Sequence, residues 1–316
     1  MIGHAVITGA TGTIGMALIR KCIENGTDVT VLVNPDSPRL ERLPLDPHVK
    51  IVKCALVGLA EFDASSVPKD ADCAMFHLAW AGTFGGARDD RALQERNAAY
   101  ADDAVRLAAK LGCRTFVGAG SQAEYGRVSG TLAPDTPCAP ENEYGRAKLA
   151  ASEHTRNLCR DLGIRHIWPR ILSIYGPYDG QRTMIMSLIS SLLDGKKPAL
   201  TKGEQMWDYL YADDAASALL LLAESGTDGG IYPIGSGTAR PLKEYIETVR
   251  DIIDPQIPLG FGEVPYAENQ VMHLCADISK LKEDTGFTPR VSFLEGARRT
   301  VDFVRAERAA GKMQTG

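Results

Sequence analysis

The sequence lacks the features of several common protein classes. Its seven cysteines include no CxxC pair and its six histidines show no metal-ligand spacing, so we expect reduced thiols and no metal site. The longest apolar run, residues 218–223, is far short of the roughly 20 residues that span a bilayer. A net charge of −5 and a pI near 5.7 argue against a nucleic-acid or anionic-membrane partner.

Low-complexity segments, internal repeats and the form of a signal peptide are also missing from the chain. Apolar residues make up 44% and charged residues 24%, which is ordinary for a globular protein. Together with the scattered cysteines, these observations predict a soluble, cytoplasmic protein.

Short strand patterns alternate with helical patterns in the first half of the chain. Strands are predicted at residues 5–8, 28–33, 50–53, 73–79 and 114–118, and helices up to about residue 25 and at residues 98–111. Such alternation implies right-handed βαβ units, and therefore an α/β fold with a parallel, doubly wound sheet. Beyond residue 170 the alternation weakens, with helices predicted at residues 183–193 and 213–224 and a strand at 209–211. We interpret this part as a smaller lobe that forms the substrate pocket.

Three glycines near the start of the chain form a pattern typical of dinucleotide binding. Gly9, Gly12 and Gly15 follow the first predicted strand and open a helical pattern. The first glycine permits the tight turn, the second lets the backbone approach a pyrophosphate, and the third lets the helix pack on the sheet. The free N–H groups at the helix N-terminus would then face the phosphates. We therefore expect the cofactor to be held by Gly9, Thr11, Gly12, Thr13 and Ile14.

The residues after the second predicted strand bear on the choice between NADP and NAD. NAD sites commonly place an acidic residue at the end of this strand to hold the ribose 2′-OH, and Val33 stands there instead. Asn34, Ser37 and Arg39 are donors within loop reach of a 2′-phosphate. We therefore favour NADP over NAD. Two alternatives stay open: Asp36 could turn inward and restore NAD binding, and Arg39 could be a solvated loop charge.

Tyr144 and Lys148 supply the main catalytic signal. They are four residues apart, so on a helix they lie on one face. A tyrosine phenol has a pKa of about 10 when unperturbed, and a neighbouring ammonium together with a nicotinamide cation would lower it. Ser121 would hold the reacting oxygen, Tyr144 would pass its proton, and Lys148 would also bind the nicotinamide ribose. The alternative is an amphipathic helix with an exposed Tyr and Lys.

Further short motifs extend this pattern over almost the whole chain. They are residues 77–79, Asn97, Ser121 with 125–126, Arg170 with 175–177, 208–214, 234–237, 277–280, and 286–289 with 295–296. With the glycine turn and the Tyr144–Lys148 pair, they make the chain resemble the extended short-chain dehydrogenases/reductases. This group contains NAD(P)-dependent sugar-nucleotide epimerases, dehydratases and reductases.

The resemblance implies an organisation and a larger set of site residues. We expect a Rossmann-type NAD(P)-binding domain at residues 1–170, a mainly substrate-binding lobe at 171–310 with some segments returning to the first domain, and a tail at 311–316. A homodimer and a nucleotide-sugar substrate are also implied. The expected cofactor site gains Leu56, Leu78, Ala79, Asn97 and Ile171. The expected substrate site comprises Ala81, Gln122, Ala123, Ser173 and Trp207.

One departure from the family pattern bears on the reaction. Dehydratases of the family carry an Asp–Glu pair directly after the catalytic hydroxyl, where this chain has Gln122 and Ala123. Glu124 lies one residue later and, in an extended segment, would point differently. We therefore disfavour 4,6-dehydration.

A second departure concerns the substrate phosphates. Many family members grip a diphosphate with an Arg where Trp207 stands, and often have Asn where Ser173 and Pro233 stand. The pocket therefore either uses other cations, with Arg182, Lys202 and Lys280 as candidates, or takes a substrate that is not a typical nucleotide sugar. Trp207 could stack on a base or sugar, or simply pack between the lobes.

Two reactions and one non-catalytic role remain open. A 4-ketoreductase delivers hydride once, whereas an epimerase removes hydride and returns it to the other face, and both need the same catalytic groups. The NADP preference favours the reductase; the alternative is an epimerase with tightly held NAD. A non-catalytic NAD(P)-binding sensor would typically lack Tyr144 or Lys148, and this chain has both.

Overall fold

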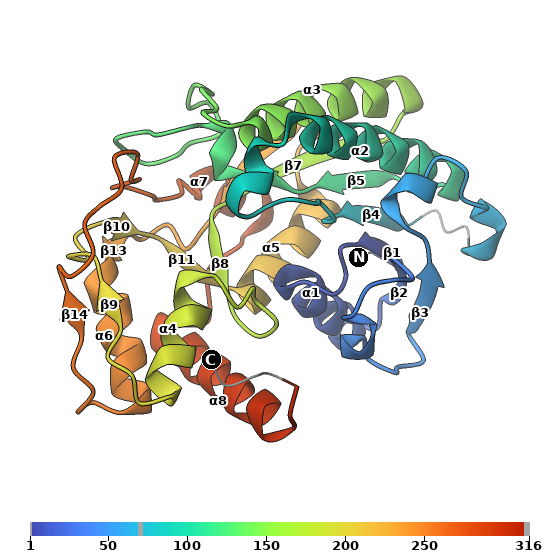
Figure 1. Ribbon diagram of the computed structural model, residues 1–316. Helices are drawn as coiled ribbons and strands as arrows, with labels where there is room; N and C mark the ends of the chain where they lie inside the picture. Colours follow the sequence, from blue (N-terminus) through green and yellow to red (C-terminus); the bar gives the residue numbers. More distant parts are fainter. Residues whose placement is uncertain (1, 69–71, 313–316) are drawn as a thin grey trace.

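A parallel sheet forms the centre of the molecule in the computed structural model, which describes residues 2–68 and 72–312 (Figure 1). Its strands are β1 (His4–Thr8), β2 (Asp28–Val33), β3 (Val49–Lys53), β4 (Cys73–His77), β5 (Thr115–Gly118), β6 (Gly120–Ser121), β7 (Arg165–Ile171) and β12 (Gly230–Ile234). Their order is β12–β7–β5–β4–β1–β2–β3, with β6 paired to β7, and every pairing is parallel. The order reverses between β1 and β4, which is where ligands bind in open α/β sheets.

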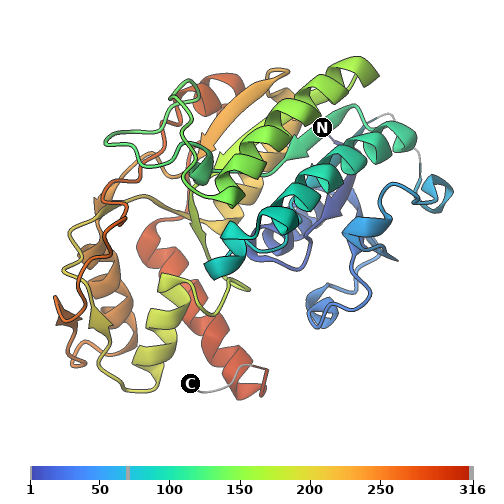
Figure 2. The same cartoon turned by 45° about the horizontal axis from the view of Figure 1, so that its top comes forward.

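Helices cover both faces of this sheet. One face carries α1 (Thr13–Glu24) and α5 (Ala212–Ser225), with α7 (Ser279–Thr285) against α5, and the other carries α2 (Arg91–Leu111) and α3 (Glu143–Leu162). Figure 2 shows α2 and α3 side by side over the sheet. Fully buried alanines, Ala101 on α2 and Ala151 on α3, let the two helices approach closely. The Rossmann-type doubly wound architecture predicted from the sequence is thereby confirmed.

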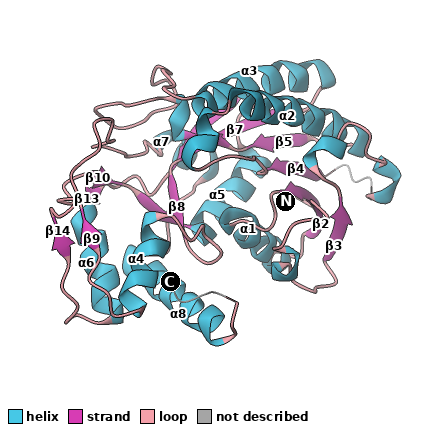
Figure 3. Cartoon of the chain, in the orientation of Figure 1, coloured by secondary structure: helices cyan, strands magenta, loops and turns pink. Residues whose placement is uncertain are grey.

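The later part of the chain builds a separate group of helices. The helices α4 (Met184–Leu193), α6 (Leu242–Ile253) and α8 (Phe293–Ala309) lie together beside the sheet (Figure 3). They share an apolar cluster that includes Tyr175 and Tyr245. Three two-stranded pairs accompany them: β8 (Ser173–Tyr175) with β11 (Tyr209–Tyr211), β9 (Ala199–Leu200) with β14 (Gly260–Phe261), and β10 (Met206–Trp207) with β13 (Arg240–Pro241). The elements α5 and β12 follow residue 171 yet pack on or join the main sheet.

Several element bounds differ from the sequence predictions for local reasons. The strand β4 ends at His77 rather than at residue 79. The helix α2 begins at Arg91 rather than at Ala98, because the Asp90 side chain accepts a hydrogen bond from the Leu93 N–H and caps the helix there. Residues 313–316 of the expected tail lie outside the described part. Within residues 2–68 and 72–312, no helix combines the length and apolar character needed to cross a membrane.

Candidate active site

The predicted cofactor residues line a cleft at the carboxyl ends of β1, β2 and β4. A cavity of about 720 Å³ is lined by Gly9, Thr11, Gly12, Asn34, Ser37, Arg39, Leu56, Leu78, Ala79 and Ala81, among others. A neighbouring cavity of about 290 Å³ is lined by Gly9, Gly12, Thr13, Ile14, Leu78 and Ile171, among others. The structure therefore brings together, at the carboxyl ends of the strands, residues that are up to 162 positions apart in the sequence, from Gly9 to Ile171.

The three glycines of the turn have different surroundings. A Cβ on Gly9 would lie 2.6 Å from the Ala79 nitrogen, and one on Gly15 would lie 2.4 Å from the Gly9 carbonyl oxygen, so both positions are closed by backbone. A Cβ on Gly12 would meet only the Gly9 oxygen at 3.6 Å and would otherwise enter the cleft. Gly12 is also the N-cap of α1 and gives it no side-chain cap, which leaves backbone N–H groups for a phosphate. This cradle fits a dinucleotide.

Two guanidinium groups lie at the adenosine end of the cleft. Arg39 lines the cavity, and Arg42 donates to the Thr11 carbonyl oxygen at 3.5 Å. Burial lowers the pKa of Arg42, and the charge on Arg39 lowers it further. Among the described residues neither forms an ion pair with a carboxylate. Asp36 lines the same cavity, so this end holds charges of both signs.

The predicted catalytic residues are all buried beside the cleft. Ser121 ends β6, and Tyr144 and Lys148 lie in the first turns of α3, which begins after the N-cap Asn142. The Lys148 Nζ donates to the Ala119 carbonyl oxygen at 2.6 Å and lies 3.6 Å from the ring centroid of Trp80. Burial lowers the pKa of Lys148 to about 7, although Glu124 acts in the opposite direction. The ammonium is therefore confined to a narrow slot between α3 and the sheet edge.

The phenol of Tyr144 has a second cationic neighbour that the sequence did not reveal. The Cζ of Arg88 lies 4.4 Å from the ring centroid of Tyr144, closer than the Nζ of Lys148 at 5.9 Å. Burial raises the pKa of Tyr144, while the Ser121 hydroxyl and Arg88 each lower it. Among the protein's own groups, burial therefore outweighs the favourable neighbours, and the pKa of Tyr144 lies above its usual value.

Trp80 and Arg88 belong to the segment that follows β4. The Trp80 indole donates to Gln94 Oε1 at 2.7 Å and its edge meets the Tyr144 ring at 90°. Arg88 lies in a 3₁₀ turn at Gly85–Asp89, within a loop that has no periodic sequence signal. Trp80 directly follows the motif at residues 77–79, so its place at the sheet edge was predictable from its position.

Hydrogen bonds hold several residues of the expected cofactor and substrate sites in place. The Asn97 amide donates to the Ala81 carbonyl oxygen at 2.9 Å and accepts from the Ala81 N–H at 3.0 Å, so it holds the segment after β4. Trp207 donates to the Ser173 hydroxyl at 2.8 Å, which brings these two predicted substrate residues together. Lys280 pairs with Asp284 at 2.9 Å and is engaged there.

The segment after Ser121 turns sharply and does not remain extended. Gln122 and Ala123 form a 3₁₀ turn with Glu124, whose carboxylate is fully buried against Arg170. Neither Gln122 nor Ala123 carries a carboxylate. Within the described residues, no cluster of three or more His, Cys, Asp or Glu side chains could hold a metal ion.

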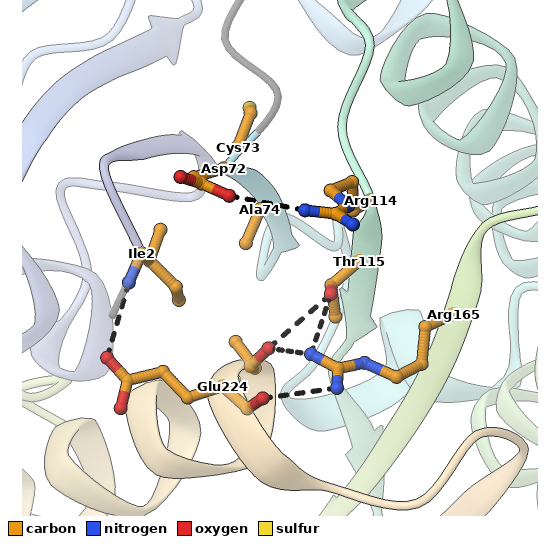
Figure 4. A pocket seen from close by; sticks show the side chains of 9 residues that line it. Ile2, Asp72, Cys73, Ala74, Arg114, Thr115, Arg165 and Glu224 are labelled. Atoms are coloured by element: carbon orange, nitrogen blue, oxygen red, sulfur yellow. Dashed lines mark hydrogen bonds and ion pairs between the residues drawn. The ribbon is translucent and has the colours of Figure 1, made fainter.

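A further cavity, of about 400 Å³, lies at the amino ends of the strands, where β1, β4, β5 and β7 begin (Figure 4). Several of its polar groups form hydrogen bonds or ion pairs with one another, although the buried Arg165 Nε has no partner in the part of the chain that the structure describes. Arg165 donates to the Glu224 carbonyl oxygen at 3.1 Å and to the Thr115 hydroxyl at 2.9 Å, and Arg114 pairs with Asp72 at 3.3 Å. Because ligands of such sheets bind at the carboxyl ends of the strands, we assign no site here.

A parallel sheet with a glycine cradle and a Ser–Tyr–Lys trio defines the class of short-chain dehydrogenases/reductases. Residues 5–235 match the model of the NAD dependent epimerase/dehydratase family, and the chain belongs to this family. The resemblance to the extended members of the class is confirmed. A dTDP-glucose 4,6-dehydratase of Neisseria meningitidis serogroup B is 25% identical over 94% of this chain and 92% of that protein.

Solved structures share the fold over nearly the full chain. A UDP-N-acetylglucosamine 4-epimerase from Methanobrevibacter ruminantium M1, in complex with UDP-N-acetylmuramic acid, superposes with a TM-score of 0.86 at 23% identity, covering 96% of this chain and 99% of that one. DesIV, a dTDP-glucose 4,6-dehydratase from Streptomyces venezuelae with NAD bound, gives a TM-score of 0.83 at 23% identity, covering 97% and 98%. At these identities the likeness concerns the fold alone.

Proposed function

We propose that this protein is an NADP-dependent reductase that reduces the 4-keto group of a nucleotide-linked sugar. The observation that carries the proposal is the buried Ser121, Tyr144 and Lys148 beside a dinucleotide cradle, with no carboxylate at Gln122 and Ala123. The trio supplies hydrogen-bonding and proton transfer, whereas dehydration needs an additional acid and base.

Each catalytic residue has a defined task in this proposal. Bound NADPH would supply the hydride. Ser121 would donate a hydrogen bond to the sugar carbonyl oxygen, and Tyr144 would give its proton to that oxygen as the carbon becomes an alcohol carbon. Lys148 would bind the cofactor ribose and keep a positive charge near the phenol. Trp80 and Arg88 hold the Tyr144 ring from two sides.

The adenosine end of the cleft supports NADP as the cofactor. Val33 offers no carboxylate to a ribose 2′-OH, and Asn34, Ser37 and Arg39 line the cavity at this point. The Asn34 and Ser37 side chains accept from the backbone N–H groups of Asp36 and Arg39, which shapes the loop around the cavity. A guanidinium in this place suits the doubly charged 2′-phosphate of NADP.

An epimerase with tightly held NAD is the second candidate. The observation in its favour is Asp36, which lines the same cavity and could accept from a ribose 2′-OH. The two reactions differ in the fate of the cofactor. With nucleotide-4-ketosugars as substrates, consumption of one NADPH for each product supports the reductase. With the corresponding 4-hydroxy nucleotide sugars, isomerisation without net consumption of cofactor supports the epimerase.

Replacing Arg39 by Ala is expected to weaken NADPH binding by about tenfold, or about 1.4 kcal/mol, and to leave NADH binding unchanged. The reason is that only NADPH carries the 2′-phosphate that the guanidinium would contact. Fluorescence titration of both cofactors measures this, and NADH is the internal control. Tighter NADH binding by the wild-type protein would contradict the NADP assignment.

Replacing Arg88 by Gln is expected to move the pH dependence of the reverse reaction, sugar oxidation, to higher pH. The groups that face the phenol are Ser121, Arg88, Lys148 and Trp80, with Glu124 behind Ser121. Oxidation requires the phenolate. Loss of the Arg88 charge raises the pKa of Tyr144, so the rate rises only at higher pH than in the wild-type enzyme.

The measurement is kcat against pH, with Arg91→Gln as the matched control. Arg91 lies close along the chain but is exposed and paired with Glu95 at 2.7 Å. An unchanged profile for Arg88→Gln, or an equal shift for Arg91→Gln, would show that Arg88 does not act on the phenol.

The homodimer and the cytoplasmic location remain predictions.

A further inference from the structure

Glu124 carries a carboxylate that is completely shielded from solvent beside the catalytic serine. Its Oε2 accepts from the Arg170 Nε at 2.6 Å, and its Oε1 accepts from the Ser121 backbone N–H at 2.7 Å. The Trp168 indole N–H bridges both oxygens, at 3.1 and 3.2 Å. Glu124 is 0% exposed and Arg170 3%. All of these donors converge on one anionic group.

Ser121 is held by one hydrogen bond to the Glu124 carboxylate and by another to the backbone of the turn that contains Glu124. The Ser121 hydroxyl accepts from the Ala123 N–H at 3.2 Å while the Ser121 N–H donates to Glu124, which makes a reciprocal cap for the turn. In the pairing of β6 with β7, Gly120 lies opposite Arg170. The same ion pair therefore joins the serine to the neighbouring strand.

Gly120 makes room for this arrangement. A Cβ at Gly120 would lie 2.7 Å from Glu124 Oε1 and 2.4 Å from Trp168 Nε1. Its backbone does not have a positive φ, so the need for glycine here comes from the close approach of the carboxylate and the indole. The absence of a side chain at Gly120 thus allows the Glu124 carboxylate and the Trp168 indole to lie directly against the backbone that precedes Ser121.

A buried ion pair adds little net stability, because desolvation of both charges offsets their attraction. A buried pair of this kind can instead specify a geometry. Catalysis depends on such geometry, since a displacement of about 1 Å in a reacting group can lower a rate by about 100-fold. Of the predicted catalytic residues, Ser121 is the one that hydrogen-bonds to the pair, through its backbone N–H.

We propose that Glu124 and Arg170 form a positioning pair, in which Glu124 fixes Ser121 in the orientation needed to hold the substrate oxygen. The inference rests on the proposed function, because it gives Ser121 that role. Glu124 itself acts through Ser121 and does not act on the substrate.

Two double variants separate positioning from general stability. E124Q/R170M and E124M/R170M both remove the two charges of the pair together, so neither variant leaves Glu124 or Arg170 as a lone buried charge, and both remove the Glu124 charge near Lys148 alike. The amide oxygen introduced by E124Q can still accept from the Ser121 N–H, whereas the thioether introduced by E124M cannot replace it. The measurements are kcat and KM, and hydrogen exchange of the Ser121 amide.

E124M/R170M is expected to have a kcat about 10- to 100-fold lower than that of E124Q/R170M, with KM within about threefold. Its Ser121 amide is expected to exchange at least about tenfold faster. The proposal is supported by both differences together and is overturned if either is absent. A merely structural role would change the two variants alike in both measurements.

Glu124→Asp provides a second test if a double variant fails to fold. It keeps the charge beside Arg170 but withdraws the carboxylate from Ser121 by one methylene group, so kcat is expected to fall; wild-type kcat would overturn the proposal. If the wild-type protein reduces none of the nucleotide sugars, the proposed function fails, and the amide exchange alone then decides whether Glu124 fixes Ser121.

Discussion

Tyr144→Phe is expected to lower turnover by about 10²- to 10⁴-fold while cofactor binding and folding are retained. The change removes only the phenol oxygen, which is the group that would pass the proton. The ring keeps its neighbours: the edge of Trp80, with centroids 6.3 Å apart, and the Arg88 guanidinium at 4.4 Å. The measurements are kcat, the affinity for NADPH and the melting temperature.

Tyr232→Phe is the matched control for this prediction. Tyr232 is also buried, but it lies in β12, and its hydroxyl donates to Asp284 and accepts from the Thr227 N–H at 2.8 Å. Its loss should lower stability by about 1–3 kcal/mol and leave turnover near the wild-type value. Near-normal turnover in Tyr144→Phe would remove the phenol from the mechanism.

Gly12→Val is expected to reduce the affinity for NADP(H) by at least about 100-fold, or about 2.7 kcal/mol. A side chain at this position would meet only the Gly9 oxygen at 3.6 Å and would occupy the space of the cleft. The backbone of Gly12 has φ −87° and ψ 170°, which a valine adopts without strain. The loss of stability should therefore stay within about 1 kcal/mol, the usual effect of a poor N-cap.

Gly15→Ala should have the opposite pattern. Its Cβ would lie 2.4 Å from the Gly9 oxygen and 2.7 Å from the Ala10 Cα, so α1 must move away from the sheet. We expect thermal unfolding to show a destabilisation of about 1–3 kcal/mol. Relative to this destabilisation, the fall in affinity for NADP(H) should be smaller than in Gly12→Val. Unchanged cofactor affinity in Gly12→Val would show that the cradle does not hold the dinucleotide.

The parallel sheet was predictable because its early strands are short and followed by turns, and all except the lysine-containing β3 are largely apolar. The predicted bounds of β2 agree with the structure, and those of β1, β3 and β5 agree within a residue. The helices α6 and α8 were missed, because frequent proline and glycine around them suggested irregular structure. Their apolar faces pack on each other, and this tertiary contact is invisible to a local pattern.

The identity of the catalytic trio followed from spacing, but its electrostatics did not. The Tyr144–Lys148 spacing predicts a shared helix face, and α3 provides it. The direction of the Lys148 ammonium toward Ala119 and Trp80, and the approach of Arg88 to the phenol, depend on how a loop folds over the helix. Glu124 points inward because the chain turns immediately after Ser121, where an extended segment was assumed.

Transfer of deuterium from C4-labelled NADPH to the sugar would decide the reductase assignment in a single experiment. With a nucleotide-4-ketosugar as substrate, we expect one deuterium in each product molecule, on the reduced carbon, and one NADPH consumed for each product. With the 4-hydroxy nucleotide sugar as substrate, isomerisation at C4 that leaves NADPH unchanged and takes up no deuterium from it would instead indicate the epimerase reaction. Product that forms without deuterium from the added cofactor would contradict the reductase assignment.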